Sequence, residues 1–207
     1  MRYILTCVLC MLTLTVSAQS ARNILDATAA KIKQLGDVKG TFTATSFKGT
    51  TEQGSTKGTM LLQGKKMQLS TDEMTMWYNG KTQWSLMSES GEVNVSNPTE
   101  REIANMNPYS FINMYQKGYK MSARQTKLRG KDVYEVHMVA RNAANNTQEI
   151  YVDVTKSDYT PLCIRIRQDN EWNRISIHTL QGNQQFSDAD FEFPKSEYPN
   201  VEVIDLR

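Results

Sequence analysis

The sequence is poor in residues that could cross-link the chain. It contains three cysteines in 207 residues. Cys7 and Cys10 lie in an N-terminal segment that we expect to be removed, which leaves Cys163 as the only thiol. Because a single thiol cannot form an internal disulfide, the fold is expected to depend on its hydrophobic core.

The sequence also lacks the patterns of common catalytic and metal sites. His137 and His178 are its two histidines, and both lie in alternating runs typical of strands. His178 shares a strand face with Ser176, but that serine is not part of a G-x-S-x-G motif and has no evident acidic partner. There is no glycine-rich phosphate loop and no carboxylate cluster with metal-ligand spacing. We therefore expect a protein that is not an enzyme and that uses no cofactor or metal.

An excess of one charge is absent as well. The sequence has 24 lysines and arginines against 22 aspartates and glutamates, a formal net charge of +2. This balance gives no overall field that would attract a polyanion. Nucleic acid is therefore not expected as a partner.

Long apolar runs are confined to the N-terminus. The first residues, MRYILTCVLCMLTLTVSAQ, contain a basic residue at position 2, an apolar stretch over 3–16 and small residues before Gln19. This pattern is typical of a cleaved secretory signal peptide. The stretch is short for a membrane span, and no later one approaches the ~20 apolar residues that a span needs. We predict a signal peptide over 1–18 and a single domain, a soluble monomer, over 19–207.

After the signal, the sequence predicts one helix and then many strands. In SARNILDATAAKIKQLG, Leu25, Thr28 and Ile32 fall on one stripe, and Gly36 follows the last turn. From residue 38 onward, short extended runs are separated by turn residues, as in a meander. The predicted fold class is α+β, a single curved antiparallel sheet of about eleven strands with helices on one side.

The strand pattern is interrupted once, over 97–119. Thr99 and Glu102 have the spacing of a capping box, and Asn107-Pro108 supplies the start of a second short helix. The helix around Phe111 is either a movable cover or a permanent part of the core.

The stretch MTMWYNGKTQWSLM, residues 74–87, is apolar on both sides. Asn79-Gly80 predicts a two-residue turn that pairs Tyr78 with Lys81. The alternation of side chains gives one face Trp77, Trp84 and Leu86 and the other face Met74, Met76 and Tyr78. A hairpin without a polar face indicates either a two-sided core or a surface for an apolar ligand, and the methionines fit both.

These motifs, in their order, resemble the outer-membrane lipoprotein carrier family (the LolA type) of Gram-negative periplasms. The resemblance rests on GTFTATSF, MLLQGKKMQL, YNGKTQWSL, EVNVSN, NPYSFINMY and FEFPKSEYPNVEVIDL, and it spans essentially the whole mature chain. It implies a half-open barrel whose concave face is closed by a helical lid around a cavity for acyl chains.

The resemblance also implies the function, the partners and the site. The protein would be a periplasmic carrier that moves acylated lipoproteins from an inner-membrane exporter to an outer-membrane acceptor, which the sequence does not identify. A lipid-binding sensor or scaffold on the same fold is the alternative. Trp84 and Leu86 are predicted to face the cavity. The full set of predicted cavity and lid residues is Phe42, Met60, Leu62, Met67, Met76, Trp84, Leu86, Ile103, Met106, Phe111, Ile112 and Tyr115.

The sequence departs from the better-known carriers in the strand that reads LLQGKKMQL. Those carriers have an Arg-Pro pair there, and the arginine latches the lid by hydrogen bonds. Gly64, Lys65 and Lys66 stand at this place. Because a lysine is a point charge, it cannot reproduce the fork of a guanidinium group.

Overall fold

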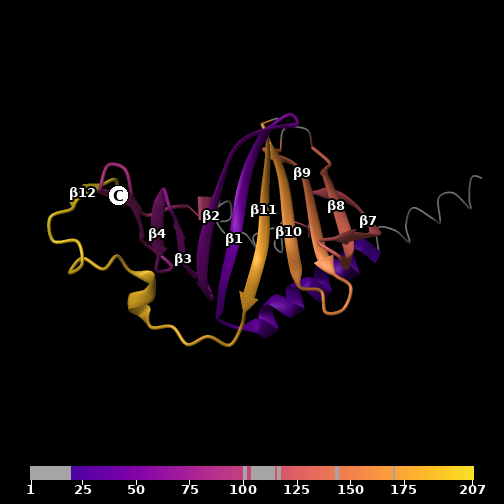
Figure 1. The fold of residues 1–207 in the computed structure, drawn as a ribbon, viewed down its shortest axis with the longest axis horizontal. Coiled ribbons are helices and arrows are strands. Elements are labelled where there is room, and N and C mark those ends of the chain that lie inside the picture. The colour runs from indigo at the N-terminus through magenta and orange to yellow at the C-terminus, as the bar shows by residue number, and fades with distance from the viewer. Residues whose placement is uncertain (1–19, 100–101, 104–114, 116–117, 143–144, 170) are drawn as a thin grey trace, which may run out of the picture. The chain divides into compact units, whose positions relative to one another are not determined.

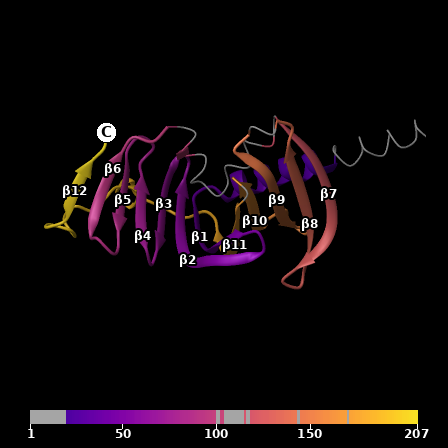
Figure 2. The ribbon, with the colours of Figure 1, turned by 90° about the horizontal axis from the view of Figure 1, so that it is seen from above.

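The computed structural model of the chain describes residues 20–99, 102–103, 115, 118–142, 145–169 and 171–207. This part of the chain forms a helix over 20–35 and then twelve strands (Figure 1). The strands are β1 (Val38–Lys48), β2 (Thr51–Gln63), β3 (Lys66–Thr71), β4 (Met74–Tyr78), β5 (Gln83–Met87), β6 (Glu92–Ser96), β7 (Tyr119–Leu128), β8 (Lys131–Ala140), β9 (Thr147–Thr155), β10 (Pro161–Gln168), β11 (Glu171–Gln181) and β12 (Glu202–Asp205), with a 3-10 helix, η1 (Asp188–Phe191), before β12. Hydrogen-bonded neighbours follow the order β12-β6-β5-β4-β3-β2-β1-β11-β10-β9-β8-β7 (Figure 2). The predicted α+β class, with one large and mostly antiparallel sheet, is confirmed.

The prediction of a wholly antiparallel sheet is wrong at the C-terminus. Strand β12 runs parallel to β6, with Val203 opposite Val93. The tail crosses β3 and β4 through η1 before it reaches β6. It therefore enters the sheet edge at the end where β6 begins, and a parallel pairing results.

The predicted helical lid lies mostly outside the described residues. Thr99, Glu102 and Ile103 at its start are described, and the predicted capping box is confirmed. The Glu102 carboxylate accepts hydrogen bonds from the Thr99 N–H at 2.7 Å and from the Thr99 hydroxyl at 2.8 Å. These bonds hold the pKa of Glu102 below its ordinary value. Ile103 donates its N–H to the Thr99 carbonyl, as the first helical turn requires.

The chain divides into two compact units. The first contains Met1–Ile32, Phe47–Thr51 and Phe111–Arg174, and the second contains Lys33–Ser46, Glu52–Ser110 and Ile175–Arg207. The prediction of one mature domain that begins at residue 19 stays a prediction. In the part of the chain that the structure describes, no helix has the length and hydropathy to cross a membrane.

The first unit joins the N-terminal helix to strands β7 to β10. One sheet face is apolar because the register places Met138 beside Ile150 and Val152 beside Ile164, all fully buried. The helix runs across the ends of these strands in Figure 1. Its own buried stripe consists of Ala21, Ile24, Leu25 and Thr28. The amphipathic helix that the sequence predicts is therefore present, and Gly36 follows it with a φ of 64°.

In the second unit, the hairpin register differs from the prediction. Trp77 lies opposite Trp84, and Tyr78 lies opposite Gln83, so the loop has four residues instead of two. The Asn79 carboxamide explains the longer loop, because its oxygen accepts hydrogen bonds from the N–H groups of Lys81 (3.1 Å) and Thr82 (2.9 Å). Gly80 has a positive φ of 98° but Asn79 does not, whereas the predicted turn needs both.

Candidate functional site

A face rich in methionine crosses strands β2 to β4 of the second unit. We call it the methionine face, and it consists of Leu62, Met67, Leu69, Met74, Met76 and Tyr78. The register sets these side chains side by side, with Met67 between Leu62 and Tyr78 and with Leu69 opposite Met76. Ile103, from the capped turn after β6, packs against this cluster. The structure therefore brings four of the predicted cavity residues together: Leu62, Met67, Met76 and Ile103.

Strand β1 extends the methionine face through close packing against β2. A Cβ atom added to Gly40 would lie 2.7 Å from the Met60 methyl carbon, and one added to Gly58 would lie 2.5 Å from the tip of the Phe42 ring. Phe42 thus lies over Gly58, on the same face as Met60. These two predicted residues also belong to the methionine face.

At β5 polar residues border the methionine face, except where Met87 lies opposite Met74. Met76 lies opposite Ser85, and Ser85 lies opposite Asn94 of β6. The Gln83 amide donates a hydrogen bond to the Ser85 hydroxyl at 2.9 Å. An apolar ligand on this face would therefore contact β1 to β4 and, at β5, only Met87.

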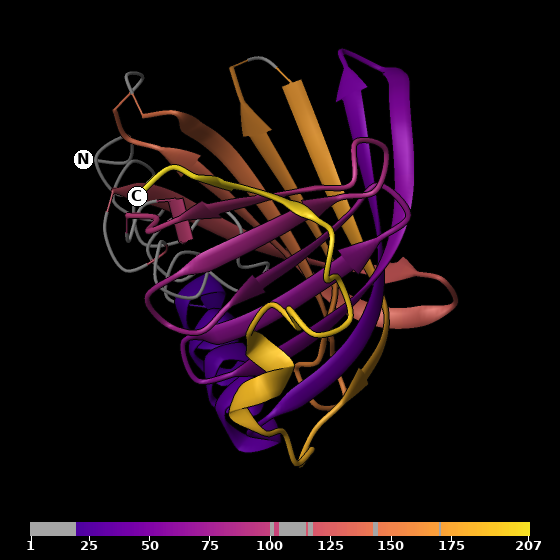
Figure 3. The ribbon, with the colours of Figure 1, turned by 90° about the vertical axis from the view of Figure 1, so that its left-hand side faces the viewer.

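The opposite side of the hairpin is covered by the C-terminal segment. We call it the tryptophan face, and it consists of Trp77, Trp84, Leu86, Val93 and Val95. Phe193 packs edge-on against Trp77, with ring centres 5.6 Å apart. Figure 3 shows the C-terminal segment, in yellow, crossing the strands of this unit. Trp84 and Leu86 thus lie on the opposite side of the sheet from Met76, and the predicted residues do not form one surface.

Lys66 stands where the sequence departs from the better-known carriers. Its side chain links β3 to the C-terminal segment. Its ammonium group lies 2.5 Å from the Asp188 carboxylate and 6.0 Å from the centre of the Phe191 ring. Phe191 is fully buried. Lys66 therefore anchors η1 on the tryptophan face, and Lys65 is exposed.

Tyr115 contacts the N-terminal helix in the first unit. Its hydroxyl donates a short hydrogen bond to the Asp26 carboxylate, and the Arg22 guanidinium lies 6.0 Å from its ring centre. Burial, together with the hydrogen bond to Asp26, raises the pKa of Tyr115 to about 12. Tyr115 stays neutral at physiological pH and fixes this point of the chain to the helix. Met106, Phe111 and Ile112 lie outside the described residues.

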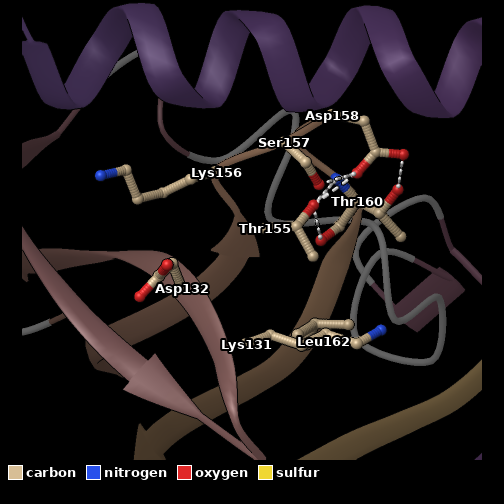
Figure 4. Close-up of a pocket in the computed structure, with 8 residues that line it drawn as sticks. All are labelled: Lys131, Asp132, Thr155, Lys156, Ser157, Asp158, Thr160 and Leu162. Carbon is tan, nitrogen blue, oxygen red and sulfur yellow. Dashed lines mark hydrogen bonds between the residues drawn. The ribbon is translucent and has the colours of Figure 1, made fainter.

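A polar hollow lies at the turn between β9 and β10 (Figure 4). The polar groups around Asp158 bind one another. The Asp158 carboxylate accepts hydrogen bonds from the hydroxyls of Thr155 (2.5 Å) and Thr160 (2.8 Å) and forms an ion pair with Lys31 of the helix (3.0 Å). These contacts hold the pKa of Asp158 far below its ordinary value, the bond from Thr155 first among them. These contacts fix the helix to the turn between β9 and β10. The Asp158 carboxylate is therefore occupied by bonds within the protein.

The outer face of the first unit carries a network of charges. The Glu135 carboxylate binds Arg124 at 2.5 Å and Arg165 at 2.6 Å. Asp153 lies 3.6 Å from Arg165. Burial raises the pKa of Asp153 to about 6 against the opposing charge of Arg165. Among the described residues, no group of three or more His, Cys, Asp or Glu side chains is placed to hold a metal ion.

The prediction from sequence missed three members of the methionine face. Leu69, Met74 and Tyr78 pack in the same cluster as Met67 and Met76. The alternation along 67–78 was the available signal, because each of the three lies an even number of residues from a predicted one.

Comparison with known proteins adds the family and the fold. The chain matches the family model described as "Outer membrane lipoprotein carrier protein LolA" over residues 11–170. No curated protein matches it. An uncharacterized conserved protein from Thermus thermophilus is similar in structure, with a TM-score of 0.58 and 9% identity over 90% of this chain and 99% of that chain. LprF from Mycobacterium bovis has a TM-score of 0.53 and 10% identity over 86% of this chain and 98% of that chain. Likenesses at these identities show a shared fold.

Proposed function

Because the chain belongs to the family of outer membrane lipoprotein carrier proteins of the LolA type, we propose that it carries the acyl chains of lipoproteins on the methionine face. The family that the sequence motifs indicate is thereby the correct one. The observation that supports the proposal most is the clustering of Met67, Met76 and Tyr78 with the half-buried Leu62, Leu69 and Met74. This surface is apolar throughout, and it has polar residues at its border.

The chemistry of the methionine face suits a ligand that must be both held and released. Transfer of an acyl chain from a bilayer into water costs ~0.8 kcal/mol per CH₂, or about 12 kcal/mol for a chain of about fifteen methylenes. A carrier must offset most of this cost with apolar contacts. Methionine side chains are unbranched and polarisable, so they adapt to acyl chains of different length without hydrogen bonds that would fix one geometry.

The route of the cargo follows from the family. The carrier would work in the periplasm after cleavage of the signal peptide over 1–18. It would receive acylated lipoproteins from an inner-membrane exporter and deliver them to an acceptor in the outer membrane. Ile103 marks the place where the segment after β6 meets the methionine face, and displacement of that contact would admit the acyl chain.

Two neighbouring leucines of β2 allow a matched test. Leu62 lies on the methionine face opposite Met67, and Leu61 points to the other side of the sheet opposite Gln68. Both are half-buried. Leu62→Asp places a carboxylate against the proposed acyl path, whereas Leu61→Asp makes the same change away from it.

The measurements are displacement of a naphthalene sulfonate dye by fatty acid and release of lipoprotein from spheroplasts. Leu62→Asp should lose both activities while circular dichroism shows a folded protein, and Leu61→Asp should keep them. Equal activity of the two variants would place the acyl site elsewhere. Lipid binding without delivery to outer-membrane vesicles would favour a sensor or scaffold.

A further inference from the structure

The last strand of the sheet has a free edge with a defined hydrogen-bonding pattern. Strand β12 is the outermost strand, next to β6, in the order of the described strands (Figure 2). The Leu206 N–H donates to the Val95 carbonyl at 2.8 Å. In a parallel pair the backbone groups alternate in direction, so Ile204 also faces β6 while Val203 and Asp205 face outward. The outer edge therefore offers two N–H donors and two C=O acceptors.

An apolar hollow lies beside the start of this edge. Its volume is about 380 Å³, and its lining includes Leu86, Met87, Tyr198, Pro199 and Val201. The Tyr198 ring stacks on Phe193 with centres 5.4 Å apart, which gives the hollow a fixed wall. Val203 and Leu206 follow along the edge with 49% and 64% of their surface exposed. Apolar groups beside an open strand edge are typical of a binding surface.

Four acidic residues lie on β12 and β6 or next to the residues that line the hollow. Glu92 and Glu202 are direct partners in the β6–β12 register, so two like charges point to the same face. Glu89 and Glu197 belong to the turns that form the hollow. None of these four carboxylates forms an ion pair with another described residue. A cation brought by a partner would relieve this repulsion.

The charges also disfavour a second copy of the chain as the occupant. If two β12 edges paired antiparallel about a two-fold axis, the outward-facing residues would pair with each other, so Asp205 would lie opposite Val203 or Asp205 of the other copy, and both copies would add their Glu202 carboxylates to the interface. A segment with basic side chains avoids this repulsion and gains from the same carboxylates.

We propose that the free edge of β12 and the hollow beside it bind an extended segment of a partner protein. The segment adds a strand to β12, inserts an apolar side chain into the hollow and places lysine or arginine beside Glu92 and Glu202. The proposal does not rest on acyl binding, because the site lies at the sheet edge and the polar Ser85 and Asn94 separate that edge from Met76.

Selection of random linear peptides displayed on phage against the mature protein tests the proposal. Peptides that alternate apolar and basic residues should be enriched. Bound to the wild-type protein, such a peptide should slow hydrogen exchange of the Val203 and Asp205 amides by at least about tenfold. The proposal would be overturned if no peptide were enriched, if acidic peptides were enriched, or if protection were confined to other strands. A concentration-dependent dimer that the peptide does not dissociate would also overturn it.

Charge reversal supplies the matched control. The double variant Glu92→Lys/Glu202→Lys should weaken binding of the selected peptide by more than about tenfold, since two attractive charges become repulsive. Glu52→Lys/Glu171→Lys changes the net charge equally at exposed positions outside the site, and it should bind as the wild type does. If both double variants lost peptide affinity equally, the effect would be non-specific electrostatic attraction, and the site would be refuted. Dye displacement by fatty acid should stay normal in all variants.

Discussion

Trp77 and Trp84 lie directly opposite each other on β4 and β5, yet one is buried and the other is only half-buried. The difference comes from the C-terminal segment, because Phe193 packs edge-on against Trp77. The apolar surface on this side of the hairpin is therefore largely covered by the chain itself. The apolar tryptophan face of the hairpin is thus explained by the segment that covers it. The other apolar face is part of the methionine face, which we propose as the acyl site.

We expect Trp77→Ala to lower the free energy of unfolding by about 3–5 kcal/mol, because a large buried side chain is lost and Phe193 loses its contact. Urea denaturation measures this change. Trp84→Ala should cost clearly less, since that ring is only half-buried. Fatty-acid displacement at the methionine face should be unchanged in Trp84→Ala, and a loss there would contradict the assignment of the two faces.

The four-residue loop makes Asn79 a stabilising residue. Asn79→Ala removes the acceptor for the N–H groups of Lys81 and Thr82 and should cost about 1 kcal/mol of stability. Asn79→Asp keeps an acceptor oxygen in place and should retain most of the wild-type stability. If Asn79→Ala melts at the wild-type temperature, the loop does not depend on these hydrogen bonds.

Two glycines of β2 should respond differently to alanine. In Gly58→Ala the new Cβ would lie 2.5 Å from Phe42 and 2.7 Å from the Ser70 carbonyl oxygen, so backbone must move. We expect a loss of about 1–3 kcal/mol in thermal or urea denaturation. Gly54 has no atom within 4 Å of such a Cβ. Gly54→Ala should be neutral or slightly stabilising, and equal losses at both sites would exclude the packing of Phe42 as the cause.

The buried carboxyl of Asp153 should make stability depend on pH. Burial raises its pKa to about 6, against the charge of Arg165 and with Glu135 acting in the same direction as burial. The folded state thus holds the proton more tightly than the unfolded chain, whose ordinary value is 3.8. The contribution of Asp153 to stability is therefore largest below about pH 4 and decreases as the pH rises through 6.

Asp153→Asn should remove this dependence. The stability of the variant relative to the wild type should increase between pH 4 and pH 6, as measured by urea denaturation across that range. A carboxyl NMR titration of the wild type reports the pKa directly. An Asp153 that titrates near its ordinary value of 3.8 would refute the argument.

The sequence was sufficient to predict which side chains share a face, although it misplaced the hairpin register. The observed pairing differs from the predicted one by two residues, and the side-chain period of a strand is also two. Trp77, Trp84 and Leu86 therefore share a face under either register. The alternation of side chains does not show which face of the hairpin another segment covers. The prediction that Trp84 and Leu86 face a cavity therefore had no support in the alternation.

The contacts of the C-terminal segment were beyond prediction from the sequence. The pairing of β12 with β6 and the ion pair of Lys66 with Asp188 join residues that lie far apart in the chain. Local propensity and periodicity carry no information on such partners. The capping box of Thr99 and Glu102, in contrast, depends on residues three apart and was predicted correctly.

The parallel pairing of β12 with β6 also determines the order in which the sheet is completed. Strand β6 pairs with its second neighbour only after β12 has been made, because Glu202 follows its partner Glu92 by about 110 residues. During synthesis, the outer edge of β6 has no hydrogen-bonding partner until the residues of β12 emerge. A chain that ends early would keep this side open, with Val93 and Val95 beside it. Loss of a few terminal residues would then cause aggregation before it altered the methionine face.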